Sequence, residues 1–165
     1  MKEFSIPLNS EYERPVINLY NLPALIDTGA VVPIFSIYTE LLEKYFKTKK
    51  ILEDTSVGGI GGSANGSVYS IAEFKIGELI FENIEVFVPR KPAIKFPFLL
   101  SATLFRGMDF EFDRINEKFI VRMKDDQNLK RDFKLKKMNG RMYPQIDGIL
   151  IDDIDIELND GFIFF

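Results

Sequence analysis

Apolar and polar residues alternate in several short segments of the chain, which is typical of β-strands with one buried face. The clearest segment is 79–88, which strict alternation would divide into two faces: Ile80, Glu82, Ile84 and Val86 on one, and Phe81, Asn83, Glu85 and Phe87 on the other. Gly77 and Glu78 form a two-residue turn signal between this segment and a second strand pattern at 68–76. The two segments therefore predict a β-hairpin.

Shorter apolar runs extend the pattern. Residues 16–20, 22–26 and 51–57 are predicted strands, and 108–112 with 118–121 flank a polar turn and predict a second hairpin. Many short strands separated by turn signals indicate a mainly β domain.

Two segments predict short helices. Ser36 can cap a helix that continues to residue 46, with an inner face made of Leu41, Leu42, Tyr45 and Phe46. The positive charge of 47–50 is expected at the C-terminal end of this helix. The second helix is predicted over 101–105, with Ser101 as its cap.

The composition changes after residue 123. Residues 124–137 are highly charged and include a basic cluster at 130–137, which we expect to form a solvated face. Residues 146–158 alternate apolar and acidic side chains and favour an edge strand, and the apolar end at 162–165 is expected to be packed or at an interface. We therefore expect a domain over 1–123 and a C-terminal extension over 124–165.

Bulk composition limits the partners and the compartment. The chain has 165 residues and a net charge of −4, so it fits one domain without the basic surface that nucleic acid requires. It has no cysteine and hence no disulfide framework, which fits a reducing compartment. Residues 1–7 lack the apolar core of a signal peptide, and no apolar run is long enough to span a bilayer. We expect a soluble, cytoplasmic protein that binds neither nucleic acid nor membrane.

The absence of histidine as well as cysteine excludes most catalytic chemistries. A Ser-His-Asp triad needs an imidazole base, a cysteine enzyme needs a thiol, and zinc sites are built largely from His and Cys. We expect no metal and no cofactor. General acid–base chemistry by Asp and Glu is what the composition permits.

One run supplies a candidate for that chemistry. In Leu25-Ile26-Asp27-Thr28-Gly29-Ala30, an apolar strand delivers a carboxylate directly into a tight turn. Two carboxylates held close together share a proton, so that one acts as base and the other as acid on a water between them. The run contains one such carboxylate, and the chain has no second Asp-Thr-Gly.

The segment 24–30 resembles the active-site loop of the retropepsin-like aspartic proteases. The Gly-rich stretch 57–66 is similar to the flap of that family, and 68–88 is similar to the return strand of the flap and the strand beyond it. The apolar run 98–100, the short helix after it and 108–110 follow in the order of the family. A Gly usually follows the apolar pair in the family, and Ser101 takes that place here.

The resemblance, which covers about 16–121, implies a closed β-barrel with one or two short helices that is active as a homodimer. It implies that Asp27 of each chain forms the dyad, that Thr28 braces the two loops and that Gly29 lets the substrate backbone approach. Expected substrate-binding residues are Ala30, Val32, Gly58, Gly59, Ile60, Gly61 and Leu99. The apolar pocket candidates, which also include Phe35, suggest a preference for apolar residues beside the cleaved bond.

The leading hypothesis is therefore an aspartic endopeptidase that cleaves peptides or proteins as a homodimer. An alternative from a different class is a non-catalytic β dimer that uses the same fold to bind peptide or protein. A third is a monomer whose single carboxylate forms no dyad.

Overall fold

The computed structural model describes residues 1–59, 62–92 and 95–151. Within them the fold is mainly β, as the alternation predicts, with one α-helix, α1 (Thr39–Tyr45), and one 3-10 helix, η1 (Ala102–Phe105). The strands are β1 (Lys2–Pro7), β2 (Val16–Leu19), β3 (Leu22–Asp27), β4 (Ile34–Phe35), β5 (Thr48–Gly59), β6 (Gly62–Ile76), β7 (Leu79–Pro89), β8 (Phe98–Ser101), β9 (Asp109–Asp113), β10 (Lys118–Met123), β11 (Lys130–Met138), β12 (Arg141–Ile146) and β13 (Ile149–Leu150).

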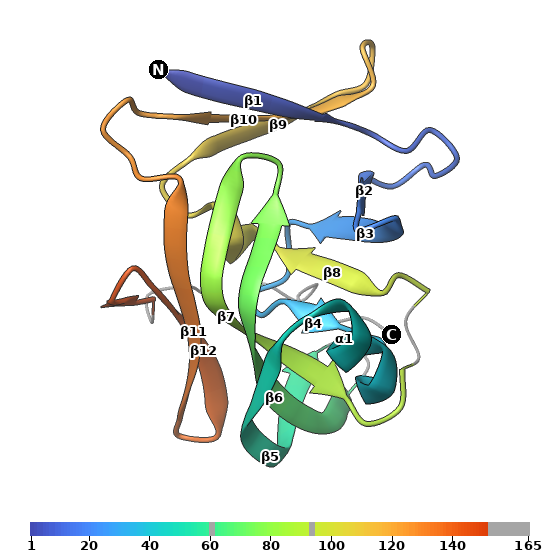
Figure 1. The fold of residues 1–165 in the computed structure, drawn as a ribbon, viewed down its shortest axis with the longest axis vertical. Coiled ribbons are helices and arrows are strands. Elements are labelled where there is room, and N and C mark those ends of the chain that lie inside the picture. The colour runs from blue at the N-terminus through green and yellow to red at the C-terminus, as the bar shows by residue number, and fades with distance from the viewer. Residues whose placement is uncertain (60–61, 93–94, 152–165) are drawn as a thin grey trace.

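A small sheet with the strand order β1-β10-β9 lies across one end of the molecule (Figure 1). The predicted hairpin of β9 and β10 is present, and β1 pairs antiparallel with β10 from Lys2 opposite Met123 to Pro7 opposite Lys118. The N-terminal segment is therefore held in a sheet rather than left as a free end.

The larger sheet places the strand that carries Asp27 in its interior. Its described strands follow the open order β13-β12-β11-β7-β4-β8-β3-β2, and the β5–β6 hairpin branches from β7. β3 runs parallel to β8, so that both strands end at the same edge, with Asp27 opposite Ser101. The predicted hairpin of β6 and β7 is confirmed and turns at Gly77, whose φ is +59°.

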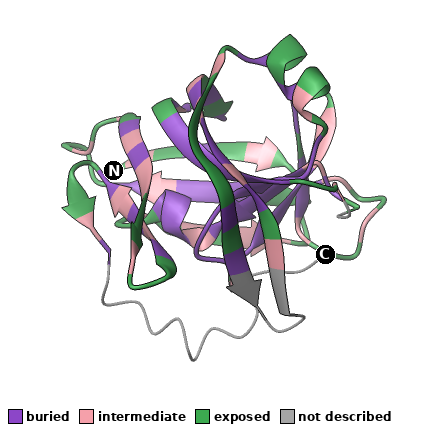
Figure 2. Ribbon diagram, turned by 90° about the horizontal axis from the view of Figure 1, so that it is seen from below, coloured by how far each residue is buried: buried purple, intermediate pink, exposed green. Residues whose placement is uncertain are grey.

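Two clusters of buried side chains form the core. The first contains packed aromatic rings, with Phe35 and Phe98 centred 4.7 Å apart at 65°. The second lies around the segment after Asp27 and joins residues from distant parts of the chain: Val16, Leu25, Ala30, Val31, Val32, Ile34, Val57, Val68, Phe87, Phe96, Leu99 and Met142. Figure 2 shows buried positions concentrated on the central strands, while α1 is largely exposed.

The strict alternation predicted for 79–88 is wrong. Asn83 has a φ of +54°, a conformation that asparagine tolerates better than most residues. This turn in the backbone interrupts the period of two, so Phe81 lies in the same core cluster as Ile84 and Val86, while Phe87 belongs to the other cluster.

The predicted first helix is shorter than expected. α1 begins after Tyr38, so Ser36 is not its cap, and the strand β5 starts at Thr48, within the segment expected to close the helix. Leu42 and Phe46 are buried as predicted, but Leu41 and Tyr45 are exposed. A helix of seven residues presents too few turns to bury four side chains on one side.

Part of the charged extension is packed into the fold. β11 pairs in parallel with β7, with Lys130 opposite Ile80, and the β11–β12 hairpin runs beside β7 (Figure 1). The expectation of a wholly solvated basic cluster is wrong, because Arg131 is 8% exposed and Phe133 is fully buried. The lysines of this strand are half-buried or exposed. The acidic run beyond 151 and the apolar end at 162–165 lie outside the described residues.

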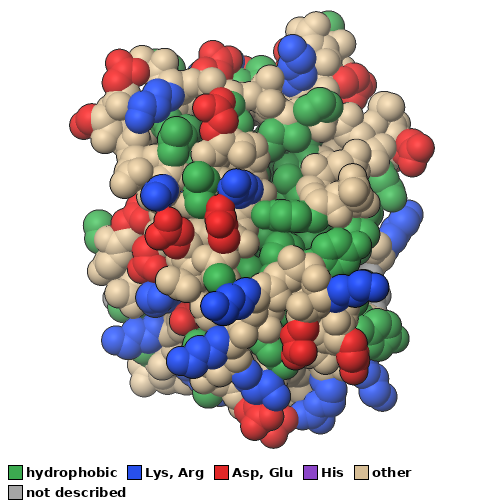
Figure 3. Space-filling view, viewed as in Figure 1, with side chains coloured by type: hydrophobic (Ala, Val, Ile, Leu, Met, Phe, Trp, Pro, Cys, Tyr) green, Lys and Arg blue, Asp and Glu red, His purple; other side chains and the backbone are tan. Residues whose placement is uncertain are grey.

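Charged side chains of both signs are interspersed over the face shown in Figure 3, around a smaller apolar area. Within the described ranges, no helix has the length and apolar character needed to cross a membrane.

Candidate active site

Asp27 is the last residue of β3, and three buried residues, Ala24, Leu25 and Ile26, lead into it. The amide of Ala30 donates a hydrogen bond to the Asp27 carbonyl at 3.1 Å, which closes a turn directly after the strand. The apolar strand fixes the depth of Asp27, and the turn fixes its direction. This local geometry is the one that the sequence predicts.

The carboxylate of Asp27 is buried and only half satisfied. Asp27 is 8% exposed, and its Oδ1 accepts a hydrogen bond from the Gly29 amide at 3.0 Å. Oδ2 has no hydrogen-bond partner, and in the described part of the chain no other buried side-chain nitrogen or oxygen lacks one. Buried polar groups are normally paired, so an exception marks a functional candidate.

Burial raises the pKa of Asp27 above its ordinary value, because the charged form loses hydration. The hydrogen bond from Gly29, the positive charge of Arg14 and the amide of Ala30 oppose this rise. Asp27 therefore keeps its proton to a higher pH than an exposed aspartate, which suits a carboxyl group that must act as an acid.

The residues next to Asp27 differ in exposure. Thr28 is exposed, Gly29 is half-buried and Ala30 is buried. Ala30, Val32 and Leu99 lie in one buried cluster, and each of them is 1% exposed. Phe35 is fully buried in the other cluster. In this conformation these side chains are buried and present no surface to a substrate.

The Gly-rich segment forms the end of the β5–β6 hairpin. Gly58 pairs with Ser63 and Gly59 with Gly62, while Ile60 and Gly61 lie outside the described residues. Val57 on β5 belongs to the buried cluster that contains Ala30 and Val32. The hairpin and the Asp27 loop therefore contact the same apolar layer.

Gly66, at the end of the Gly-rich segment, has a packing role that the sequence does not reveal. A Cβ atom there would lie 2.2 Å from the Val88 carbonyl oxygen and 2.8 Å from the Cα of Pro89. Both neighbours are backbone atoms of β7. The glycine is therefore needed for β6 to approach β7 at the base of the hairpin.

Thr103 is a site residue that the sequence reasoning missed. Its hydroxyl donates to the Val31 carbonyl at 2.6 Å, and the Ser101 and Thr103 hydroxyl oxygens are 2.7 Å apart. Because Thr103 has one hydroxyl proton and gives it to Val31, Ser101 donates to Thr103. Ser101 is fully buried, and this bond satisfies its hydroxyl. The hydroxyl pair two residues apart is the signal that was available.

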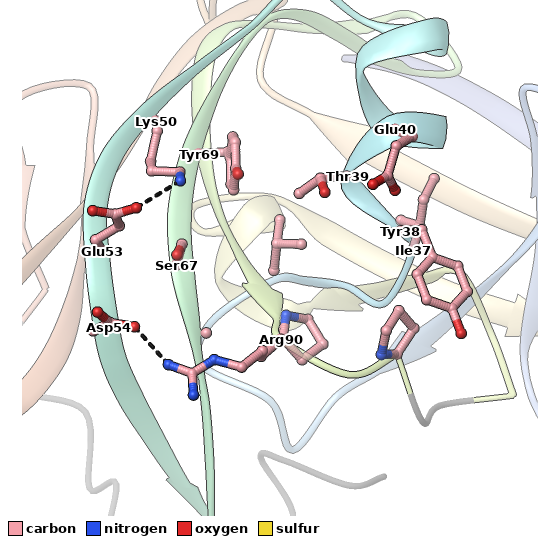
Figure 4. Close-up of a pocket in the computed structure, with 14 residues that line it drawn as sticks. Ile37, Tyr38, Thr39, Glu40, Lys50, Glu53, Asp54, Ser67, Tyr69 and Arg90 are labelled. Carbon is pink, nitrogen blue, oxygen red and sulfur yellow. Dashed lines mark hydrogen bonds and ion pairs between the residues drawn. The ribbon is translucent and has the colours of Figure 1, made fainter.

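A surface hollow of about 370 Å³ lies between the start of α1 and the β5–β6 hairpin (Figure 4). Thr39, Glu40 and Tyr69 face it, and two ion pairs line it: Lys50 with Glu53 at 2.8 Å and Arg90 with Asp54 at 2.5 Å. Asp27 is not among its lining residues.

In the described ranges, no three carboxylates gather in a way that could hold a metal ion.

No protein-family model matches the chain, and no curated protein matches it in sequence. Among solved structures, the chain is similar to a retropepsin-like aspartic protease from Rickettsia conorii. The two share 20% sequence identity, the alignment covers 74% of this chain and 90% of that one, and the TM-score is 0.42. A likeness this distant carries no argument about the chemistry of this chain.

Proposed function

We propose that this chain is an aspartic endopeptidase that hydrolyses peptide bonds as a homodimer. The observation that carries the proposal is the unpartnered Oδ2 of Asp27, on a buried carboxyl group whose pKa is raised. Leaving such an atom unpaired costs about 1–3 kcal/mol. A second carboxyl group brought against Oδ2 would supply the missing hydrogen bond.

In the proposed reaction, Asp27 of one protomer and its counterpart in the partner share one proton. The ionised carboxylate takes a proton from the water held between them, the water oxygen attacks the peptide carbonyl carbon, and the protonated carboxyl group gives its proton to the carbonyl oxygen, which forms a tetrahedral intermediate. When this intermediate collapses, the C–N bond breaks, the carboxyl group that took the water proton donates it to the leaving nitrogen, and the other carboxylate takes a proton from a hydroxyl group of the intermediate. The two titrations belong to the pair rather than to either residue. No metal or cofactor enters this scheme.

The proposal of a second copy rests on the carboxylates of the described residues, 1–59, 62–92 and 95–151. Glu85 is also buried, but its Oε1 already accepts a hydrogen bond from the Leu135 amide at 2.9 Å. The chain has no second Asp-Thr-Gly. Thr28 is exposed beside Asp27 and so is free to brace the loop of a second protomer, while Gly29 leaves room for a substrate backbone.

We propose that the substrate binds as an extended strand between the Asp27 loop and the β5–β6 hairpin. Gly58, Gly59, Ile60 and Gly61 would contact it from the hairpin. Ala30, Val32 and Leu99 would supply apolar contacts, which requires the hairpin to move away from the cluster that now buries them. The division at residue 123, with the site in the first part and an extension after it, stays a prediction.

The test is cleavage of a diverse peptide pool by wild type and Asp27→Asn, over a range of pH and protein concentration. We expect cleavage by wild type to rise more steeply than linearly with concentration and to vanish in Asp27→Asn, because both carboxylates are needed. Sedimentation of both proteins controls for dimer formation.

Two results would contradict the proposal. Absence of cleavage by a protein that sediments as a dimer would favour the peptide-binding dimer. Cleavage that is strictly linear in concentration for a protein that sediments as a monomer would exclude a dyad made from two chains.

A further inference from the structure

Arg131 is a buried cation that the proposed chemistry does not use. It lies on β11, opposite Phe81 of β7, and its side chain is 7% exposed. A buried guanidinium is costly unless its donors are paired. The fold must therefore supply hydrogen-bond acceptors around the guanidinium group. The elements that supply these acceptors are the ones that Arg131 connects.

The acceptors are at the C-terminal end of η1. Nη1 of Arg131 donates to the Leu104 carbonyl at 3.0 Å, and Nη2 donates to the Arg106 carbonyl at 2.7 Å. The last carbonyl groups of a short helix have no partner within the helix, so a two-armed guanidinium satisfies them directly. The Arg131 side chain, from the segment after residue 123, thus donates to carbonyl groups at the C-terminal end of η1.

Asp147 holds the guanidinium in place from the other side. Its Oδ2 lies 3.4 Å from Nε of Arg131, while its Oδ1 accepts a hydrogen bond from the Asp132 amide at 2.9 Å. The carboxylate is tied to the backbone of β11 as well as to the cation. This arrangement fixes the direction of the Arg131 side chain toward η1.

η1 in turn contacts the Asp27 loop in two ways. It follows β8 without a break, and β8 pairs with β3 so that Ser101 lies opposite Asp27. The Thr103 hydroxyl of η1 also donates to the Val31 carbonyl, four residues after Asp27. A shift of η1 would therefore be transmitted to the loop that holds the carboxylate.

We infer that Arg131 is a positioning residue for Asp27, acting through η1 and Thr103. The inference rests on the proposed function for its catalytic meaning, but its structural part can be measured without activity. It assigns the 124–151 segment a role in orienting the carboxylate.

The test compares Arg131→Met with Arg122→Met as a matched control. Arg122 lies on β10 and pairs with Glu111 and Glu3 at the surface. The main readout is hydrogen exchange at the amides of Gly29 and Ala30, which donate to the side chain and the carbonyl of Asp27 respectively. The reference readout is exchange in the β1–β10 ladder.

We expect Arg131→Met to speed exchange at these two amides by about tenfold, with less than about threefold change in the β1–β10 ladder, because only the local opening is easier. Arg122→Met should leave exchange at Gly29 and Ala30 unchanged. Thr103→Val should reproduce the local effect, and the double variant should show less than the product of the two single effects, since both act on one path.

Arg131→Lys covers the case in which Arg131→Met does not fold. An ammonium group is a point charge that does not reproduce the two-armed contact, so a smaller increase at the same two amides is expected. For a protein that proves to be a protease, kcat should fall by about tenfold in Arg131→Met while KM stays within about threefold.

Unchanged exchange at Gly29 and Ala30 in a folded Arg131 variant would overturn the inference. An equal increase in the β1–β10 ladder would also overturn it, since that pattern reports global destabilisation. Independent effects of Arg131→Met and Thr103→Val would exclude the path through η1. Absence of peptide cleavage by wild type would refute the proposed function alone, because the exchange results do not depend on it.

Discussion

Asp27 and Glu85 are each 8% exposed, yet the structure treats the two carboxylates differently. Glu85 lies within β7, and its Oε1 accepts the Leu135 amide from β11. β11 pairs with β7 only from Lys130 to Asp132, so the Glu85 side chain provides an acceptor beyond the end of the ladder. Asp27 lies at the end of its strand, and its Oδ2 has no partner.

The difference shows that two equally buried carboxylates can differ in how fully their oxygens are hydrogen-bonded. Glu85 satisfies a backbone amide of a neighbouring strand, which is a structural task. Asp27 is buried as well, but its Oδ2 has no hydrogen-bond partner.

The largest effect is expected on peptide hydrolysis. Asp27→Asn should lower kcat/KM by about 10⁴-fold, because an amide does not transfer the proton. Glu85→Gln keeps the oxygen that accepts from Leu135 and should leave kcat/KM within about threefold. Steady-state kinetics of both variants measures this difference. A comparable loss of kcat/KM in the two variants would contradict the different roles given to Asp27 and Glu85.

The second effect concerns stability and has the opposite order. Glu85→Met leaves the Leu135 amide without its acceptor and should lower the free energy of unfolding by about 1–3 kcal/mol. Asp27→Asn removes a poorly satisfied charge and should not lower it at neutral pH. Urea unfolding measures both, with Glu85→Gln as the control that keeps the acceptor. A larger loss in Asp27→Asn than in Glu85→Met would contradict the assignment of roles.

The third effect is on the pH dependence of stability. The pKa of Asp27 is raised in the folded state, so the folded chain binds this proton more tightly than the unfolded chain. Stability should therefore fall as pH rises from the ordinary value of 3.8 through the folded-state pKa. Asp27→Asn lacks this contribution, so its stability relative to wild type should increase with pH over the same range. Urea unfolding of both proteins at a series of pH values measures this difference. A gain in the stability of wild type relative to Asp27→Asn as pH rises would contradict the prediction.

The smallest effect is expected at an exposed carboxylate. Glu53 pairs with Lys50 at 2.8 Å, and their side chains are 65% and 43% exposed. Glu53→Gln should change the free energy of unfolding by less than about 1 kcal/mol, because water and salt screen an exposed pair. Unfolding at low and high salt provides the measurement, and a loss as large as that of Glu85→Met would show that exposure is a poor guide here.

Local features of this fold were predictable because they depend on neighbours in the sequence. The β6–β7 hairpin follows from alternation on both sides of Gly77, and the turn after Asp27 follows from an apolar strand that meets Thr28 and Gly29. The interruption at Asn83 was not predictable, because the side chains themselves still alternate and only the backbone conformation changes.

The partners of buried charges were not predictable either. Arg131 lies in a basic stretch that usually indicates a solvated surface, but parallel pairing with β7 carries it against η1. Glu85 and Leu135 are 50 residues apart, and no local pattern relates them. Such contacts depend on which strands become neighbours.

The sequence by itself determined the chemistry that is possible: no imidazole, no thiol, and one carboxylate placed at the end of an apolar strand. Only the tertiary structure decided that this carboxylate is buried with one oxygen unpartnered, that Ser101 and Thr103 support its loop, and that Arg131 closes the helix behind it. The physical reason is that side-chain type and local turns are set by adjacent residues. Burial and hydrogen-bond partners are set by packing between segments that lie far apart along the chain.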